Sequence, residues 1–175
     1  FIADNRDHAR QLKQEARDEF RSIVYGYMSR VRRGEAKLYF PDRVVQMHRV
    51  VPSASELELI GAIAKPIQKL NRLAQISILQ ALTSSPDALM AQLNNMARNG
   101  TVPVELAATV RTIVTRMPPS AKLQGLGGLI DRLKRENPER WRLVVFTGRL
   151  ETQTTIRAFL ERCGLKVGII NGASG

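Results

Sequence analysis

The sequence predicts a mostly α-helical protein with a small α/β part near its carboxyl end. Apolar residues recur at three- and four-residue spacing over most of the first 136 residues, a pattern typical of amphipathic helices. Serine and proline residues mark the starts of several of these segments. After Pro118-Pro119 the pattern changes, because two short continuous apolar runs now flank one further helical segment. That order indicates a βαβ unit.

One long helix and one strand are expected in the first part, residues 1–51. Asp4 is a suitable cap for a helix that runs to about Arg33 and carries one apolar stripe on a charged surface. Pro41 and the residue before it resist a helical conformation. Residues 43–51 are β-branched and partly alternating, so we expect a strand there.

The middle part, residues 52–119, is predicted to consist of linking helices. Ser53 and Glu56 have the spacing of a capping box, which opens a helical region that reaches about Leu82. Interruptions are expected near Gly61 and Pro66. The next helix has Ser85 as its cap and Pro86 in its first turn, and it is expected to end at Asn99-Gly100. A further helix is expected to start at Pro103 and to end at about Arg116.

The last part, residues 120–175, carries the predicted βαβ unit. A helix from Ser120 to Glu136 precedes the strand Leu143–Thr147. An amphipathic helix from Leu150 to Cys163, closed by Gly164, leads to a second strand from Lys166 to Ile170. Two parallel strands do not form a stable open sheet by themselves. We therefore expect the chain to be a fragment of a larger unit.

The net charge points to a polyanionic partner. The 175 residues include 27 Lys and Arg against 16 Asp and Glu, which gives +11. The three parts carry +4, +2 and +5, so the excess is concentrated at both ends. Most of it is arginine, whose planar guanidinium suits phosphate well. Nucleic acid is one interpretation of this charge, and a solvated surface that keeps the protein soluble is the other.

The sequence argues against several classes of protein. No apolar run reaches the roughly 18–20 residues of a membrane helix, so we expect no membrane partner. No signal peptide is visible, and a single cysteine fits a reducing compartment, so we expect an intracellular location, in the cytoplasm or nucleoid. The same cysteine, Cys163, excludes an internal disulfide framework and a cysteine-based zinc site.

No catalytic or metal-binding constellation is apparent in the chain. There is no G-x-x-x-x-G-K-[ST] phosphate loop, and the glycines between 125 and 128 fit no phosphate-binding spacing and favour a weak or kinked helix. Asp18-Glu19 lies on a charged helical face, without the apolar strand that would precede a magnesium-binding acidic pair. His8 and His48 have no second ligand at metal spacing.

The segment from Arg142 to Gly175, RLVVFTGRLETQTTIRAFLERCGLKVGIINGASG, resembles the opening of the second RecA-like lobe in Swi/Snf-type superfamily-two helicases. In that family a strand ending in aromatic–Ser/Thr–x–x leads into an amphipathic helix, and an Asp-Gly-Ser/Thr-Ser/Thr turn follows the next strand. The corresponding residues here are Phe146–Arg149 and Asn171–Ser174, with Asn171 in place of the usual Asp.

The resemblance extends upstream of this segment. Ser120–Leu123 matches the family's Ser-x-Lys-Leu, and Tyr27–Arg30 resembles the Met-Leu-Arg-Arg segment that ends the first lobe, although Val31 replaces one arginine. Residues 79–93 are similar to the prokaryotic branch that contains the RNA-polymerase-associated translocase.

The resemblance implies a role in an ATP-dependent double-stranded DNA translocase or helicase. Residues 1–51 would then end the first RecA-like lobe, residues 52–119 would form a helical linker region, and residues 120–175 would begin a truncated second lobe. ATP and Mg²⁺ would bind to other parts of the parent protein, so this chain alone is expected to hydrolyse no ATP.

The expected contacts with the DNA backbone lie where the first predicted strand meets the next helix. Ligands usually bind α/β sheets at this edge, so Thr147, the Gly148 backbone and Arg149 are expected to hold one phosphate. Further candidates are Thr152, Lys122 and Arg30. For each basic candidate the structural alternative is a solvated charge at a helix end.

A second class of function stays open at this stage. Residues 52–117 carry little charge and have Leu, Ile, Ala and Met at helical spacing. Such stripes are most often core, but an uncovered stripe mediates self-association or binds a protein partner. The alternative is therefore a helical interaction or oligomerisation module with no nucleic-acid role.

Overall fold

A computed structural model describes residues 13–28 and 43–172 of the chain. The chain divides into two units, residues 1–46 and residues 47–175. In the first unit a 3₁₀ turn, Gln14–Ala16, leads into α1 (Arg17–Tyr27). The helix expected to reach about Arg33 ends at Tyr27, because Met28 is already extended with φ −125° and ψ 126°. The predicted start at Asp4 lies outside the described residues.

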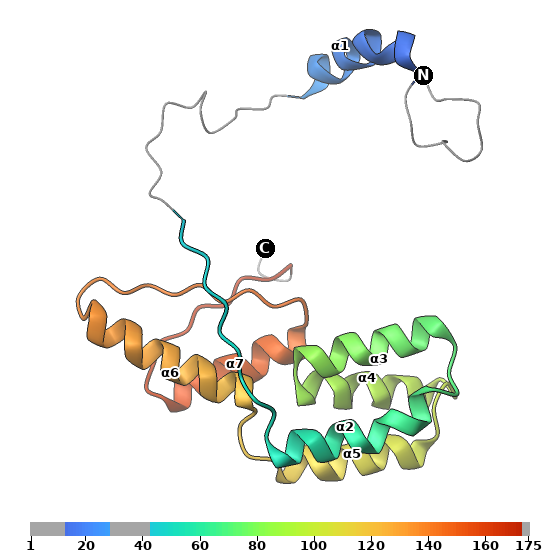
Figure 1. The fold of residues 1–175 in the computed structure, drawn as a ribbon, viewed down its shortest axis with the longest axis vertical. Helices are drawn as coiled ribbons and strands as arrows, with labels where there is room; N and C mark the ends of the chain where they lie inside the picture. The colour runs from blue at the N-terminus through green and yellow to red at the C-terminus, as the bar shows by residue number, and fades with distance from the viewer. Residues whose placement is uncertain (1–12, 29–42, 173–175) are drawn as a thin grey trace. The chain divides into compact units, whose positions relative to one another are not determined.

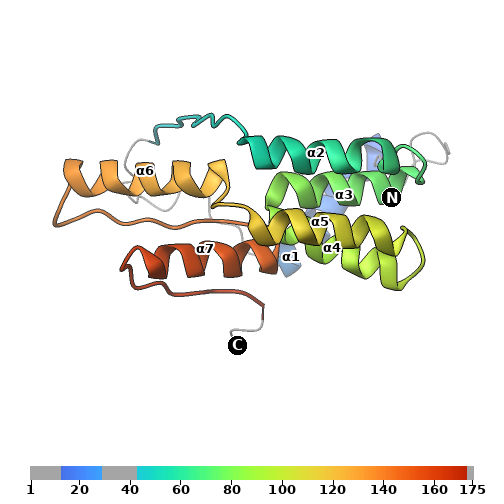
Figure 2. The ribbon, with the colours of Figure 1, turned by 90° about the horizontal axis from the view of Figure 1, so that it is seen from below.

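The second unit is built from helices. They are α2 (Ala54–Ile67), α3 (Arg72–Ser84), α4 (Pro86–Arg98), α5 (Val104–Arg116), α6 (Ala121–Glu136) and α7 (Leu150–Arg162). Figure 1 shows α2 to α5 gathered in one bundle, and Figure 2 shows α6 and α7 running side by side at one end of it. The largest fully buried side chains are Leu59, Ile63, Ile78, Leu89, Leu93 and Val110. All of them come from α2 to α5, so the core of this unit lies inside the bundle.

The helix starts and stops predicted for the bundle are confirmed. The Ser53 hydroxyl accepts a hydrogen bond from the Glu56 amide at 3.2 Å, and a Glu56 carboxylate oxygen accepts one from the Ser53 amide at 2.8 Å, which completes the capping box. Ser85 caps α4, and its hydroxyl accepts from the Ala88 amide at 3.1 Å. Gly100 follows the end of α4 with φ 68°, a conformation that glycine adopts at little cost.

The interruption expected near Gly61 is wrong, whereas the one expected near Pro66 is confirmed, because α2 ends at Ile67 and α3 begins at Arg72. Helix α2 is continuous through Gly61 and contains Pro66 in its last turn, where the helix ends one residue later. This break extends to Asn71, whose side-chain oxygen accepts from the Ala74 amide at 2.9 Å and so starts α3.

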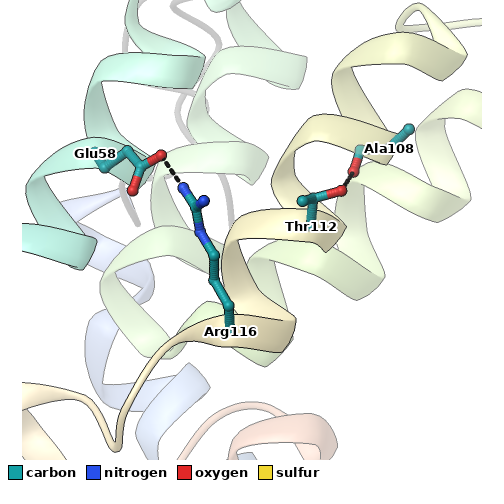
Figure 3. A network of polar contacts seen from close by, with 4 residues as sticks. All are labelled: Glu58, Ala108, Thr112 and Arg116. Carbon is teal, nitrogen blue, oxygen red and sulfur yellow. Dashed lines mark hydrogen bonds and ion pairs between the residues drawn. The ribbon is translucent and has the colours of Figure 1, made fainter.

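Polar contacts on the outside of the bundle supplement the apolar core. Arg116 near the end of α5 forms an ion pair with Glu58 of α2, as Figure 3 shows. In the same view the Thr112 hydroxyl donates to the Ala108 carbonyl of its own helix at 3.1 Å. Both side chains of the ion pair are well exposed, so the pair contributes little to the free energy of folding.

The predicted α/β part is wrong. Within residues 13–28 and 43–172 the structure contains no strand, and therefore no parallel βαβ unit of a RecA-like lobe. The run 143–147 and the run 166–170 are extended, but no ladder of hydrogen bonds joins them. Phe146 and Ile170 are each 91% exposed. The physical reason is that an apolar, β-branched run becomes a strand only when a neighbour pairs with its backbone.

The strand expected over residues 43–51 is also wrong, since this segment is extended and unpaired among the described residues. Its last part, residues 47–51, does pack against α6. A Cβ atom at Gly125 would lie 2.7 Å from Cγ1 of Val50, and one at Gly127 would lie 3.4 Å from the Phe159 ring. Helix α6 is continuous across these glycines, so they permit close packing on its surface and do not interrupt it.

The helices of the described residues are all too short or too polar to cross a bilayer.

Candidate nucleic-acid interface

Three of the residues predicted to contact DNA line one cavity of the second unit. Lys122, Thr147 and Thr152 lie around a space of about 370 Å³, together with Ser84, Ser85 and Ser120. They come from the start of α6, the loop before α7 and the first turn of α7. Of the serines, Ser84 ends α3, Ser85 caps α4 and Ser120 caps α6. The beginnings of three helices therefore converge here, each with the partial positive charge of a helix N-terminus.

Hydroxyl groups form the buried part of this cavity wall. The Thr152 hydroxyl lies 2.7 Å from the Ser84 hydroxyl and 2.7 Å from the Ser85 hydroxyl. Thr152 is 7% exposed, so these hydrogen bonds are largely shielded from water. The predicted helix cap Ser85 thus has a second task, because it also connects α4 to α7.

Helix α7 begins without a side-chain cap. Helices α2, α3, α4 and α6 are capped by Ser53, Asn71, Ser85 and Ser120, whereas Arg149 occupies the N-cap position of α7 and makes no such bond. The Thr147 hydroxyl accepts only from the Arg149 amide, at 3.5 Å. The next amides of the first turn have no partner among the described residues, which is the condition under which a helix start binds an anion.

The Arg149 side chain reaches back to the bundle. Its Nη1 donates to the Gln92 side-chain oxygen at 3.1 Å, and its Nη2 donates to the Ser77 carbonyl at 3.3 Å. Arg149 is half-buried and carries no ion pair to a carboxylate within the described part of the chain. Its positive charge is consequently held in place by neutral acceptors and is not cancelled.

The Lys122 ammonium donates to the Thr83 carbonyl near the end of α3. The helix that carries Lys122 is fixed at its start by two groups. Ser120 caps it, accepting from the Leu123 amide at 3.4 Å, and Glu56 accepts from the Ala121 amide at 3.2 Å. Lys122 is therefore anchored at a defined position on the rim of the cavity.

Gly148 does not line this cavity. Gly148 is exposed, and a Cβ atom at this position would meet nothing within 4 Å. Its backbone precedes α7 directly and stays accessible. Arg30 lies outside the described residues.

Sequence reasoning missed the residues of α4 that hold α7. The Thr155 hydroxyl donates to an Asp87 carboxylate oxygen at 2.9 Å, and Gln92 accepts from Arg149 as described. The only available signal was the polar Ser84-Ser85-Pro86-Asp87 sequence at a helix start, and such a sequence is explained completely by capping. No pattern in the chain indicated that this start meets a second helix start more than sixty residues away.

A second, larger cavity of about 650 Å³ is mostly apolar. It lies between the extended runs 143–147 and 165–170 and is closed on one side by Ile130, Ile156 and Leu160. The inward residues Leu165, Val167 and Ile169 are half-buried, and the outward residues of that run are exposed. This alternation has the period of a strand although no ladder is present.

No group of three or more metal-ligating side chains occurs in the described parts of the chain. Compared with models of protein families, with curated proteins and with solved structures, the chain has no significant match. Its function must therefore be argued from the residues of the cavity.

Proposed function

We propose that this chain is part of an ATP-dependent double-stranded DNA translocase of the Swi/Snf type. In this role it contributes contacts to the DNA backbone and connects the two lobes of the motor, while ATP and Mg²⁺ bind to other parts of the parent protein. The purified chain is expected to release no phosphate from ATP, with or without DNA. DNA-stimulated ATP hydrolysis by the chain would contradict this part of the proposal.

The uncapped start of α7 is the observation that carries the proposed DNA contact. Its first-turn amides, which have no partner among the described residues, lie with the Thr147 hydroxyl and the exposed Gly148 backbone, and Arg149 at the N-cap position adds a positive charge. Amides and hydroxyls of this kind bind phosphate oxygens without reading bases. The contact requires the start of α7 and its neighbours, and it does not require a β-sheet.

The charge of the chain supports the same proposal. Residues 120–175 carry ten basic and five acidic side chains, and the whole chain carries +11. A duplex attracts such a surface over a long range, and binding releases counterions from the DNA.

The proposal is tested by fluorescence anisotropy of a labelled duplex titrated with the purified chain. The slope of log Kd against log salt concentration is expected to be about 0.9 for every phosphate neutralised. Arg149→Ala should weaken binding more than Arg162→Ala, which removes the same charge from the other end of α7. Affinity that does not respond to salt, or equal effects of the two substitutions, would contradict the proposal.

A second candidate function is a protein-interaction or self-association module in residues 52–117. The observation that favours it is a set of exposed apolar side chains on α2 and α3, namely Leu57, Ile60, Leu73, Ile76 and Leu79. Sedimentation velocity over a range of concentrations tests this role. A concentration-dependent dimer that Leu73→Glu abolishes, together with no DNA binding, would favour this candidate over the first.

A further inference from the structure

We infer that Gln92 of α4 is a positioning residue for DNA binding, because it fixes the guanidinium of Arg149 in the orientation that receives a phosphate. This inference rests on the proposed DNA contact at the start of α7 and adds a residue of the bundle to it. It assigns a role in recognition to α4, which the sequence indicated only as part of a linker.

The hydrogen bonds of Arg149 define the orientation. An arginine side chain has five N–H donors in a planar fork. In this structure one donor of Nη1 is directed to Gln92 and one donor of Nη2 to the Ser77 carbonyl, at 3.1 and 3.3 Å. Nε–H and one further N–H on each terminal nitrogen remain, so three donors of the guanidinium are left for the oxygens of a phosphate.

Fixing the side chain in advance raises affinity. A free arginine side chain has considerable rotamer entropy, and part of this is lost when it binds a ligand. Gln92 and the Ser77 carbonyl have already restricted the side chain before DNA arrives, so less entropy is lost on binding. Of these two acceptors, only Gln92 acts through a side chain and can be replaced.

Gln92 is well placed to act without binding DNA itself. It is half-buried on α4, and its neighbour Leu93 is fully buried in the core of the bundle. Asp87, five residues earlier on the same helix, bonds to Thr155 and holds α7 in register with α4. The acceptor that orients Arg149 is therefore part of a rigid contact between the two helices.

The test is a double-mutant cycle on duplex affinity. Gln92→Met keeps the size of the side chain and removes the acceptor, and Gln80→Met on the exposed side of α3 is the matched control. We expect Gln92→Met to weaken binding by about three- to tenfold in the natural chain and to have no effect when Arg149 is already alanine. Gln80→Met should leave the affinity unchanged. Urea unfolding of each variant checks that the variant is folded under the conditions of the assay.

The outcomes separate the inference from the proposal on which it rests. If Arg149→Ala weakens binding and Gln92→Met does not, or if Gln92→Met strengthens it, the positioning role is wrong and the DNA contact stands. An equal effect of Gln92→Met in both backgrounds also overturns the positioning role, because Gln92 would then act by another route. If the chain does not bind the duplex, or Arg149→Ala has no effect, the proposed contact itself fails.

Discussion

The hydroxyl cluster around Thr152 makes a quantitative prediction about the stability of the contact between α4 and α7. Replacing Thr152 by valine keeps the β-branched shape and the volume but removes the hydroxyl. Two hydrogen bonds of 2.7 Å, to Ser84 and Ser85, are lost. The buried Ser85 hydroxyl keeps its bond from the Ala88 amide, and the half-buried Ser84 hydroxyl is accessible to water.

The expected loss follows from these contacts. A typical hydrogen bond contributes about 1 kcal/mol net, so Thr152→Val should lower the free energy of unfolding by about 2 kcal/mol. With a urea m-value of about 2 kcal/mol/M, the unfolding midpoint falls by about 1 M. Circular dichroism at increasing urea concentration measures this shift directly.

Thr154 provides the matched control on the same helix. Its hydroxyl is exposed and donates only to the Leu150 carbonyl of its own helix, at 3.0 Å. Thr154→Val should therefore change the free energy of unfolding by no more than about 0.5 kcal/mol. A Thr152→Val variant that unfolds at the same urea concentration as Thr154→Val would refute the reasoning, because the cluster would then contribute nothing beyond packing.

The remaining predictions concern α6 and the bundle, and urea unfolding measures each of them. Gly128→Ala should raise the free energy of unfolding by about 1 kcal/mol, because alanine favours a helix and nothing lies within 4 Å of the new methyl group. Gly125→Ala should raise it less, because its methyl group meets Val50. Equal increases would show that residue 50 does not pack there. Leu93→Ala should cost about 2–5 kcal/mol, since Leu93 is 0% exposed in the core, and a cost below this range would place it outside a tightly packed core. Glu58→Ala should cost no more than about 1 kcal/mol, because its ion pair with Arg116 is exposed, and a larger loss would indicate a more buried pair.

Local signals in the sequence located most helix starts and ends of the second unit, but not the start of α3 at Asn71. Ser53 with Glu56, Ser85 with Pro86, and Gly100 and Gly164 with φ 68° and 75° act within a few residues of their own positions. The physical chemistry of capping is therefore readable from a short window of sequence. The same reasoning failed at Gly61, because the cost of a glycine inside a helix depends on what that helix packs against.

The prediction of strands in the two extended runs was wrong for a different reason. Leu143–Thr147 and Lys166–Ile170 have the apolar composition of strands, and the second run also has alternating exposure. A strand, however, is a property of two segments, since its backbone groups need a neighbour to bond to. The sequence of one run contains no information about whether such a neighbour is present. Among the described residues the inward side chains of these runs line an apolar cavity, and no backbone hydrogen bond joins the two runs.

The candidate site was predictable only in part, because it is made from contacts across the chain. Lys122, Thr147 and Thr152 could be named from their positions at helix starts, and the structure brings them around one cavity. Their partners on α3 and α4 could not be named, because the serine that meets Thr152 already has a sufficient local explanation as a cap. When a residue both caps its own helix and contacts a distant helix, only the capping role can be predicted from the neighbouring sequence.

The difference between the starts of α4 and α7 explains why the proposed phosphate contact belongs to α7. Both helices begin at the same cluster, but the Ser85 hydroxyl satisfies an amide of α4, whereas α7 has Arg149 at the equivalent position and no cap. A helix start without a cap loses about 1 kcal/mol of stability. At α7 the bonds of Thr152, Thr155 and Arg149 to the bundle offset this loss, and the first-turn amides have no partner among the described residues. The bundle thus stabilises a helix start that is free to bind an anion, and this is the physical link between the helical fold and the proposed contact with DNA.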